Sequence, residues 1–285
     1  MSGDTMTKPT ARMRELMAAD ELIVSPGVFD GYSVRLVEKM GYKTACTTGA
    51  GLSNSRLGVP DVGIMGLSDN VEACRMIARS VSIPVMADAD TGYGTPANML
   101  HTVRLFEDAG VAGINIEDQV SPKRCGHMDN KEVVDINEAV SKISTAVRSR
   151  DSDRFLIMAR TDSRATHDLD EALRRGEAFL NAGADILFIE APRSVTEMEV
   201  IKQVFPDTVL VANMVEDGRT PELTTTQLAE LGYQLILRPV SALLSVAKTL
   251  QLSYESLTEP DPSGTAPPRL SFQAYNELVG LSDSE

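Results

Sequence analysis

The sequence predicts an α/β protein with a (β/α)8 TIM-type barrel and a C-terminal helical extension. Two observations predict this fold: short apolar runs alternate with longer segments of helical periodicity, and eight such runs occur along 285 residues. Strands that alternate with helices pair in parallel through right-handed crossovers, and eight of them can close into a barrel. An open doubly wound sheet is the alternative, but no G-x-G-x-x-G motif follows the first strand. The strand count therefore favours closure.

The expected strands are short runs rich in apolar and β-branched residues. In chain order they cover residues 22–29, 44–48, 83–90, 112–119, 155–162, 185–191, 208–214 and 234–239. The segments between them are amphipathic. In the segment that begins at Leu169, for example, Leu173 and Phe179 share one helical face with Leu169, and charged residues lie opposite. Many of these segments end in glycine, which commonly terminates helices.

The chain divides into an expected barrel domain, residues 1–254, and an expected extension, residues 255–285. The stretch LTEPDPSGTAPPRL, residues 257–270, has the Pro, Ser and Gly content of a linker. The following SFQAYNELVG carries an apolar stripe that includes Phe272, Tyr275 and Leu278. A helix after a linker can pack on its own barrel or on a neighbouring subunit, and the pattern leaves both open.

Composition excludes several classes of partner. Lys plus Arg is 27 against 41 Asp plus Glu, a net charge of −14, which argues against nucleic acid because its binding needs basic patches. The chain has no apolar run of membrane-spanning length, and its first residues lack the apolar core of a signal peptide. Three cysteines make a disulfide framework unexpected. We therefore expect a cytoplasmic protein with a small-molecule ligand.

Polar residues follow the expected strands directly, at the end where barrels carry their chemistry. They are Thr47, Thr48 and Gly49 after the second strand, Asp88 and Asp90 at the third, Glu117 and Asp118 at the fourth, Arg160 at the fifth, Glu190 at the sixth, Asn213 at the seventh and Pro239 at the eighth. Crowded carboxylates repel one another and need a counter-ion. Oxygen ligands suit a hard divalent cation, so Asp88, Asp90, Glu117 and Asp118 predict a site for Mg²⁺ or Mn²⁺.

Several of these residues have a structural alternative. Arg160 can serve as a salt-bridge partner, and Glu190 and Asn213 can cap the helices that follow them. His127 is expected to be a hydrogen-bonding loop residue rather than a metal ligand, because the three histidines of the chain are scattered.

Cys125 lies in a polar loop, QVSPKRCGHMDNK, that follows the fourth strand. Lys123 and Arg124 precede it, and neighbouring cations lower the pKa of a thiol and make it both a nucleophile and a proton donor near neutral pH. The carboxylates of the predicted metal site favour the role of proton donor, because cleavage of a metal-chelated hydroxy acid leaves a carbanion that needs a proton.

Five motifs together carry a family resemblance: DADTGYG, NIEDQ, KRCGH, MARTD and IEAP, in this order. They resemble the isocitrate lyase and phosphoenolpyruvate mutase superfamily, from about residue 22 to the C-terminal tail. The resemblance implies a barrel whose last helix is swapped between subunits, so residues 255–285 would pack on a neighbouring subunit of a homotetramer.

The resemblance also implies a role for each matching residue. Asp88 would be the principal metal ligand, and Asp61, Asp90, Glu117 and Asp118 would hold the waters of the metal. The substrate would contact Thr47, Thr48, Gly49, Asp61, Lys123, Gly126, His127, Arg160, Glu190, Asn213 and Pro239, with Lys123, Arg160 and Glu190 in the catalytic set. Cys125 would be the general acid that protonates the departing fragment.

The implied reaction is Mg²⁺- or Mn²⁺-dependent cleavage of a C–C bond in a di- or tricarboxylate of the 2-methylisocitrate or 2,3-dimethylmalate type. The sequence KRCGHMDNK lacks the arginine that usually follows this histidine in 2-methylisocitrate lyases. The segments NMVEDGRTP and SFQAYNELVGL look closer to the dimethylmalate lyase and petal-death-protein branch. The main alternative is an oxaloacetate hydrolase or decarboxylase, although Pro239 stands where a serine is expected in the hydrolases. An isocitrate lyase, a P–C bond mutase and a non-catalytic dicarboxylate-binding barrel are less favoured.

Overall fold

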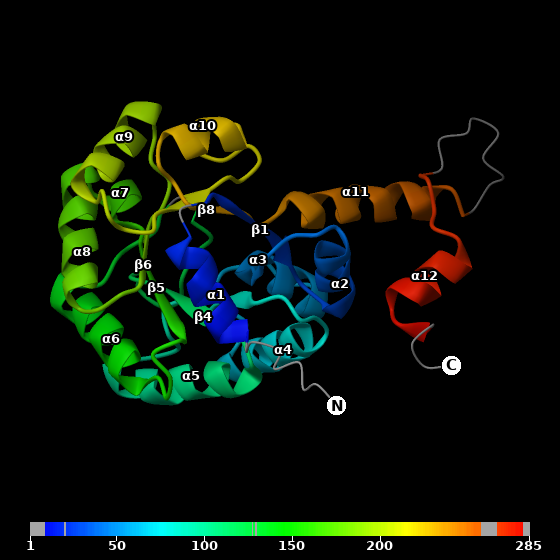
Figure 1. The fold of residues 1–285 in the computed structure, drawn as a ribbon, viewed down its shortest axis with the longest axis horizontal. Helices are drawn as coiled ribbons and strands as arrows, with labels where there is room; N and C mark the ends of the chain where they lie inside the picture. The colour runs from blue at the N-terminus through cyan, green and yellow to red at the C-terminus, as the bar shows by residue number, and fades with distance from the viewer. Residues whose placement is uncertain (1–8, 20, 127, 129, 258–266, 282–285) are drawn as a thin grey trace.

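Eight parallel strands form a nearly closed barrel in the computed structural model, which describes residues 9–19, 21–126, 128, 130–257 and 267–281 (Figure 1). The strands are β1 Ile23–Val28, β2 Ala45–Thr47, β3 Val85–Asp88, β4 Gly113–Glu117, β5 Leu156–Thr161, β6 Ile186–Ile189, β7 Val211–Asn213 and β8 Leu235–Arg238. Each lies inside its expected range, so the predicted fold class is confirmed. The physical basis is burial: β2, β4, β5 and β6 are buried along their whole length, as is typical of parallel strands covered on both faces.

The strand order is β6-β5-β4-β3-β2-β1-β8-β7. The first and last strands pair in parallel, with Ile23 opposite Leu235, and this pairing brings the two ends of the barrel domain together. The remaining seam, between β6 and β7, is joined by a single bridge between Leu187 and Leu210. The carboxyl ends of all eight strands therefore open on one face.

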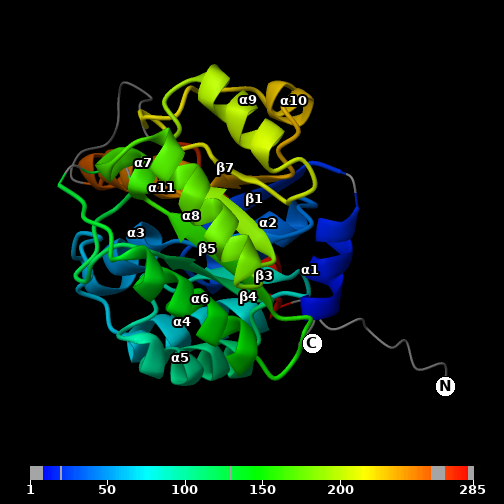
Figure 2. The same cartoon turned by 90° about the vertical axis from the view of Figure 1, so that its left-hand side faces the viewer.

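Helices surround the strands (Figures 1 and 2). They are α1 Pro9–Ala18, α2 Gly31–Lys39, α3 Gly49–Leu52, the π-helix η1 Ser53–Leu57, α4 Leu67–Arg79, α5 Pro96–Ala109, α6 Ile136–Ser149, α7 Ser163–Thr166, α8 Leu169–Asn181, α9 Val195–Val204, α10 Thr225–Glu230, α11 Ser241–Glu255 and α12 Phe272–Leu278. Polar N-cap residues begin several of the helices. At the N-terminus of α8, for example, the Asp168 carboxylate accepts from the Glu171 amide at 2.9 Å. None of the helices in the described part of the chain is long and apolar enough to cross a bilayer.

Helix α1 closes the N-terminal end of the barrel. Its Met13 is completely buried and joins the apolar cluster inside the barrel, which includes Ile23, Met158 and Leu235. Figure 2 shows α1 at the end of the molecule opposite α3 and α7, which follow strand carboxyl ends. One end of the barrel is thereby plugged with apolar side chains, and the other end is left for polar ones.

Helix α11 leaves the barrel instead of packing along it (Figure 1). It has no buried residue, and Leu244, Leu250 and Tyr254 are exposed. Helix α12 lies near α2 of the same chain, where the Tyr275 and Tyr32 rings are 5.6 Å apart. Most of the expected linker, residues 258–266, lies outside the described residues. The exchange of this extension between subunits stays a prediction.

Candidate active site at the carboxyl ends of the strands

Two adjoining hollows open at the carboxyl ends of the strands, each with a cavity volume of about 70 Å³. Thirteen of the predicted site residues line them: Thr47, Thr48, Gly49, Asp61, Asp88, Glu117, Lys123, Cys125, Gly126, Arg160, Glu190, Asn213 and Pro239. The space is far smaller than the roughly 300–1,000 Å³ of pockets for drug-sized ligands. The hollows therefore suit a small acid.

Lys123 lies at the centre of the acidic part of the site. Its ammonium is 2.6 Å from Asp61 Oδ1 and 3.0 Å from Asp90 Oδ1. Burial alone would lower the pKa of Lys123, but the surrounding carboxylates, with Asp90 and Glu117 foremost, raise it well above its ordinary value. Burial raises the pKa of Asp90 to about 6 against the opposing charge of Lys123. Lys123 is thus a permanent cation at this centre.

Asp88 is held by the residues that follow β2. The Gly49 amide donates to Asp88 Oδ2 at 3.1 Å, and the Asp88 amide donates to Thr47 Oγ1 at 3.0 Å. Thr48 caps α3 by accepting from the Gly51 amide at 2.7 Å. These contacts fix the carboxylate in one direction before any ligand binds.

Arg160 forms the opposite, cationic part of the site. It makes a fork with Asp162, at 2.8 Å from Nε to Oδ2 and 3.0 Å from Nη2 to Oδ1, and its Nη1 is 3.2 Å from Glu190 Oε2. Asn213 donates to the same Glu190 oxygen at 3.0 Å. Burial would raise the pKa of Asp162, but Arg160 and Lys131 lower it to about 2, so the pair stays ionised.

Cys125 reaches the hollow from the loop between β4 and α6. It is half-buried and lines the same cavity as Asp88, Glu117 and Arg160. The other two cysteines, Cys46 and Cys74, are buried, and burial raises the pKa of both thiols to about 12. Cys125 is therefore the cysteine best placed to react. His127, which follows Gly126, lies outside the described residues.

Gly126 allows the loop to approach the Arg160–Glu190 pair closely. A Cβ at this position would come 2.8 Å from Glu190 Oε2 and would also collide with Arg160 Nη2. We expect Gly126→Ala to lower kcat by roughly 100-fold, since displacing a catalytic group by about 1 Å can cost that much. Steady-state kinetics would check this, with Gly66→Ala as a control for glycine loss, because Gly66 has an ordinary negative φ and a Cβ there would come no closer than 3.7 Å to the Asp69 carboxylate. Unchanged kcat in Gly126→Ala would contradict the close approach.

Asp118 does not face the hollow, contrary to the predicted metal-ligand role. Its Oδ2 accepts from Thr161 at 2.7 Å and from Arg175 at 2.9 Å, and its Oδ1 accepts from the Asp162 amide at 2.9 Å. The reason is strand alternation: Glu117 points into the barrel, so its neighbour points toward α8. We therefore leave Asp118 out of the metal site.

The remaining carboxylates fit a divalent cation. Among the described residues, no three Asp, Glu, His or Cys side chains converge closely enough to hold a metal directly. However, Asn115 Oδ1 and Glu117 Oε1 are buried without a hydrogen-bond partner among the residues that the structure describes, where Asp90 Oδ1 has only its ion pair with Lys123. Unsatisfied buried oxygens beside Asp88 suit a cation that keeps several waters, as Mg²⁺ does.

Three residues of the site were missed from sequence. Asn115 lines the hollow, and its amide is 3.4 Å from Asp88 Oδ1. Its position two residues before Glu117 on one strand was a usable signal, because such residues share a face. Asp162, the last residue of the MARTD motif, lies two residues after Arg160 and therefore carried the same signal. Lys131, which bonds Asp162 at 2.7 Å, gave no signal because it lies far along a loop.

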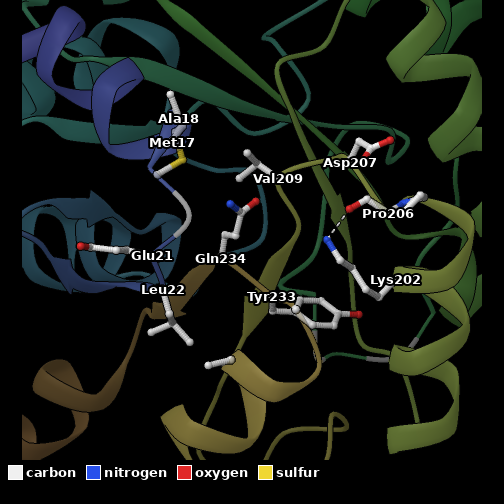
Figure 3. Close-up of a pocket in the computed structure, with 12 residues that line it drawn as sticks. Met17, Ala18, Glu21, Leu22, Lys202, Pro206, Asp207, Val209, Tyr233 and Gln234 are labelled. Carbon is white, nitrogen blue, oxygen red and sulfur yellow. Dashed lines mark hydrogen bonds between the residues drawn. The ribbon is translucent and has the colours of Figure 1, made fainter.

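A larger cavity, about 630 Å³, lies at the other end of the barrel (Figure 3). Val209 and Gln234, which line it, precede β7 and β8. Lys202 in its wall donates to the Pro206 carbonyl at 2.7 Å, which Figure 3 draws as a dashed line. Barrel chemistry is carried at the carboxyl ends of strands, so size does not make this cavity the candidate.

The chain matches known sequences along most of its length. The family model for phosphoenolpyruvate phosphomutase matches residues 13–258. The 2,3-dimethylmalate lyase of Eubacterium barkeri is 42% identical over 272 residues, covering 95% of this chain and 94% of that protein. The 2-methylisocitrate lyase of Aeropyrum pernix is 36% identical over 284 residues, covering 99% and 91%.

Solved structures of related enzymes share the fold of this chain. A 2,3-dimethylmalate lyase in a trigonal crystal form has a TM-score of 0.91 at 36% identity, covering 98% of this chain and 93% of that one. Oxaloacetate acetylhydrolase with 3,3-difluorooxalacetate has 0.92 at 32% identity, covering 98% and 96%. Phosphonopyruvate hydrolase with oxalate and Mg²⁺ has 0.86 at 27% identity, covering 98% and 97%.

Fold and site together define a (β/α)8 barrel with a carboxylate-rich site at the carboxyl ends of its strands. The chain belongs to the phosphoenolpyruvate mutase/isocitrate lyase superfamily. The resemblance stated from the five motifs is thereby confirmed.

Proposed function

We propose that the protein is a divalent-metal-dependent carbon–carbon lyase that cleaves a substituted 2-hydroxydicarboxylate to a 2-oxo acid and a second carboxylate. One observation carries the proposal: the Cys125 loop brings a half-buried thiol into the hollow lined by Asp88, Glu117 and Arg160. A proton donor beside a metal-binding carboxylate centre suits cleavage that leaves a carbanion. The names of the related lyases support the same class.

Asp88 would be the principal ligand of the metal, with Asp61, Asp90, Glu117 and Asn115 placed to hold its waters. When bound, Mg²⁺ or Mn²⁺ would polarise the hydroxyl and carboxylate of the substrate and lower the pKa of the hydroxyl. The Mg²⁺ in the related phosphonopyruvate hydrolase supports this choice. Asp88 needs no rearrangement to bind the metal, because hydrogen bonds with Gly49 and Thr47 already hold it in place.

The side chains of the site divide the chemical work. Lys123 and Arg160 supply positive charge to the substrate carboxylates, and both remain cations because nearby carboxylates raise the pKa of each. Glu190, completely buried in the same hollow, is our candidate to accept the hydroxyl proton. The C2–C3 electron pair then passes to C3, C2 becomes the carbonyl carbon of the oxo acid, and the Cys125 thiol donates its proton to C3.

The lining favours a dicarboxylate with small alkyl groups. In the described part of the chain, Lys123 and Arg160 are the two cationic side chains that line the hollows, and acidic neighbours already engage both. Ala50, Val215 and Val240 add apolar wall. A third substrate carboxylate would face desolvation without a further cation. We therefore favour 2,3-dimethylmalate over 2-methylisocitrate.

Oxaloacetate hydrolysis is the second candidate, since the oxaloacetate acetylhydrolase backbone is so similar, with a TM-score of 0.92. Pro239 argues for the lyase. It lines both hollows and has neither a hydroxyl nor an N–H to hold a hydrated ketone.

NMR analysis of products tests the proposal. The purified protein with Mg²⁺ would receive 2,3-dimethylmalate, 2-methylisocitrate, isocitrate or oxaloacetate in separate tubes, each with an EDTA control. Pyruvate with propionate is the expected result, and pyruvate with succinate would make 2-methylisocitrate the substrate. Oxalate with acetate from oxaloacetate alone would replace the lyase with the hydrolase. If no tube gave a product, the alternative of a non-catalytic dicarboxylate-binding barrel would be favoured instead.

The proposal includes a homotetramer in the cytoplasm. The exposed apolar residues of α11 support packing of residues 255–285 on a neighbouring subunit. Three free cysteines in the described chain support a reducing compartment. Light scattering of the full chain, compared with a chain ending at residue 255, would test the assembly.

A further inference from the structure

The loop between β4 and α6 is pinned firmly at its base. Gln119 pairs with Val133 in an antiparallel bridge, and the Val120 amide donates to the Glu132 carbonyl at 2.9 Å. The Gln119 side chain also bonds both the amide and the carbonyl of Arg124, at 3.0 and 2.9 Å. These contacts fix where the loop leaves the barrel, but they do not reach the Cys125–Gly126 pair.

Lys131 contacts this pair directly, at Gly126. Its side chain is 2% exposed, and its ammonium donates to the Gly126 carbonyl and to Asp162 Oδ1, the latter at 2.7 Å. Asp162 in turn forms the fork with Arg160. One buried chain of contacts therefore joins the backbone beside the proposed proton donor to the proposed substrate-binding guanidinium.

This bridge can form only when the loop lies against the barrel. A buried ammonium is stable only with its charge paired and its donors used, and here the Gly126 carbonyl supplies one of the acceptors. Gly126 is in place because it has no Cβ to meet Glu190. If the loop moved away from the barrel, Lys131 would lose this acceptor. The buried ammonium therefore favours the position in which the loop lies against the barrel.

We propose that Lys131 is a positioning residue that holds Cys125 over the site by bridging Gly126 to the Asp162–Arg160 pair. It touches no reacting atom in this role. The inference rests on the proposed function only for its kinetic part, because the position of Cys125 can be measured without turnover.

The test compares Lys131→Met and Lys131→Arg with the wild-type full chain. Lys131→Met keeps the length and apolar stem but removes the charge. We expect its kcat to fall by roughly 100-fold, as for a catalytic group displaced by about 1 Å, with KM near the wild-type value. The rate at which iodoacetamide alkylates Cys125, followed by peptide mass spectrometry, should rise several-fold because the loop is released. Lys131→Arg, which keeps a buried cation, should restore most of both values.

Lys202→Met is the matched control. Lys202 also donates to a backbone carbonyl, at 2.7 Å, but at the opposite end of the barrel (Figure 3), so its loss should change neither kcat nor alkylation. If Lys131→Met does not fold, Lys131→Leu replaces it as a second neutral variant that cannot donate to the Gly126 carbonyl. A wild-type alkylation rate in the folded neutral variant overturns the inference, whether or not the protein is a lyase. Faster alkylation in Lys131→Met, together with no turnover of any hydroxy acid by the wild-type chain, would instead overturn the proposed function and leave the inference standing.

Discussion

Cys125→Ser should lower kcat for cleavage of the 2-hydroxydicarboxylate by about 10²–10⁴-fold, the range that general acid catalysis contributes. Serine has nearly the shape of cysteine, so the contact of Gly126 with the Arg160–Glu190 pair should survive. Its hydroxyl, however, is a far weaker acid than a thiol and is a poor proton donor to the carbanion. Binding of the oxo-acid product in the presence of Mg²⁺ should remain, because Asp88 is untouched.

Two measurements separate these effects. Steady-state kinetics give the loss of turnover, and calorimetric titration with pyruvate and Mg²⁺ gives product binding. Cys74→Ser is the matched control, since that buried thiol bonds Asn70 Oδ1 at 3.2 Å and a hydroxyl can make the same bond. Near-wild-type turnover in Cys125→Ser would mean that another group donates the proton.

Asp88→Asn should reduce turnover by roughly 1,000-fold, because Lewis-acid stabilisation is worth several kcal/mol and each 1.36 kcal/mol is a factor of ten. The amide keeps the shape of the side chain and an oxygen that can accept from Gly49, so the fold should persist. It loses the charge that balances a divalent cation among Asp61, Asp90 and Glu117. Wild-type protein treated with EDTA should lose activity similarly and regain it with Mg²⁺.

Calorimetric titration with Mg²⁺ and Mn²⁺ would check whether the lost activity reflects lost metal. Asp108→Asn is the control, because Asp108 is exposed on α5, away from the strand ends. Metal-dependent turnover that survives in Asp88→Asn would move the principal ligand to another carboxylate. Turnover that resists EDTA in the wild-type protein would remove the metal from the mechanism.

The barrel and most of its site were predictable because they follow from local patterns. Alternating apolar runs and amphipathic segments are enough to indicate eight parallel strands, and parallel strands bring their carboxyl ends to one face. Asp88, Arg160 and Asn213 therefore had to lie near one another, although they are distant in sequence. The polar loop around Cys125 was predictable too, because it follows one of these strand ends.

The direction of individual side chains was a different matter. Adjacent residues on a strand face opposite sides, so of Glu117 and Asp118 one had to turn away, and the barrel register turned Asp118 toward Arg175. The departure of α11 from the barrel likewise has no local signal, since its helical pattern is that of any helix.

The bridge from Lys131 to Asp162 depends on tertiary structure for a further reason. The two residues are 31 positions apart, and their charges meet only after the loop has folded back over β5. Short-range periodicity can be predicted from the sequence, because residues within one helix or strand share a regular backbone geometry. A long-range contact between loops depends on where the completed barrel places each strand end, and that position is set by packing of the whole domain.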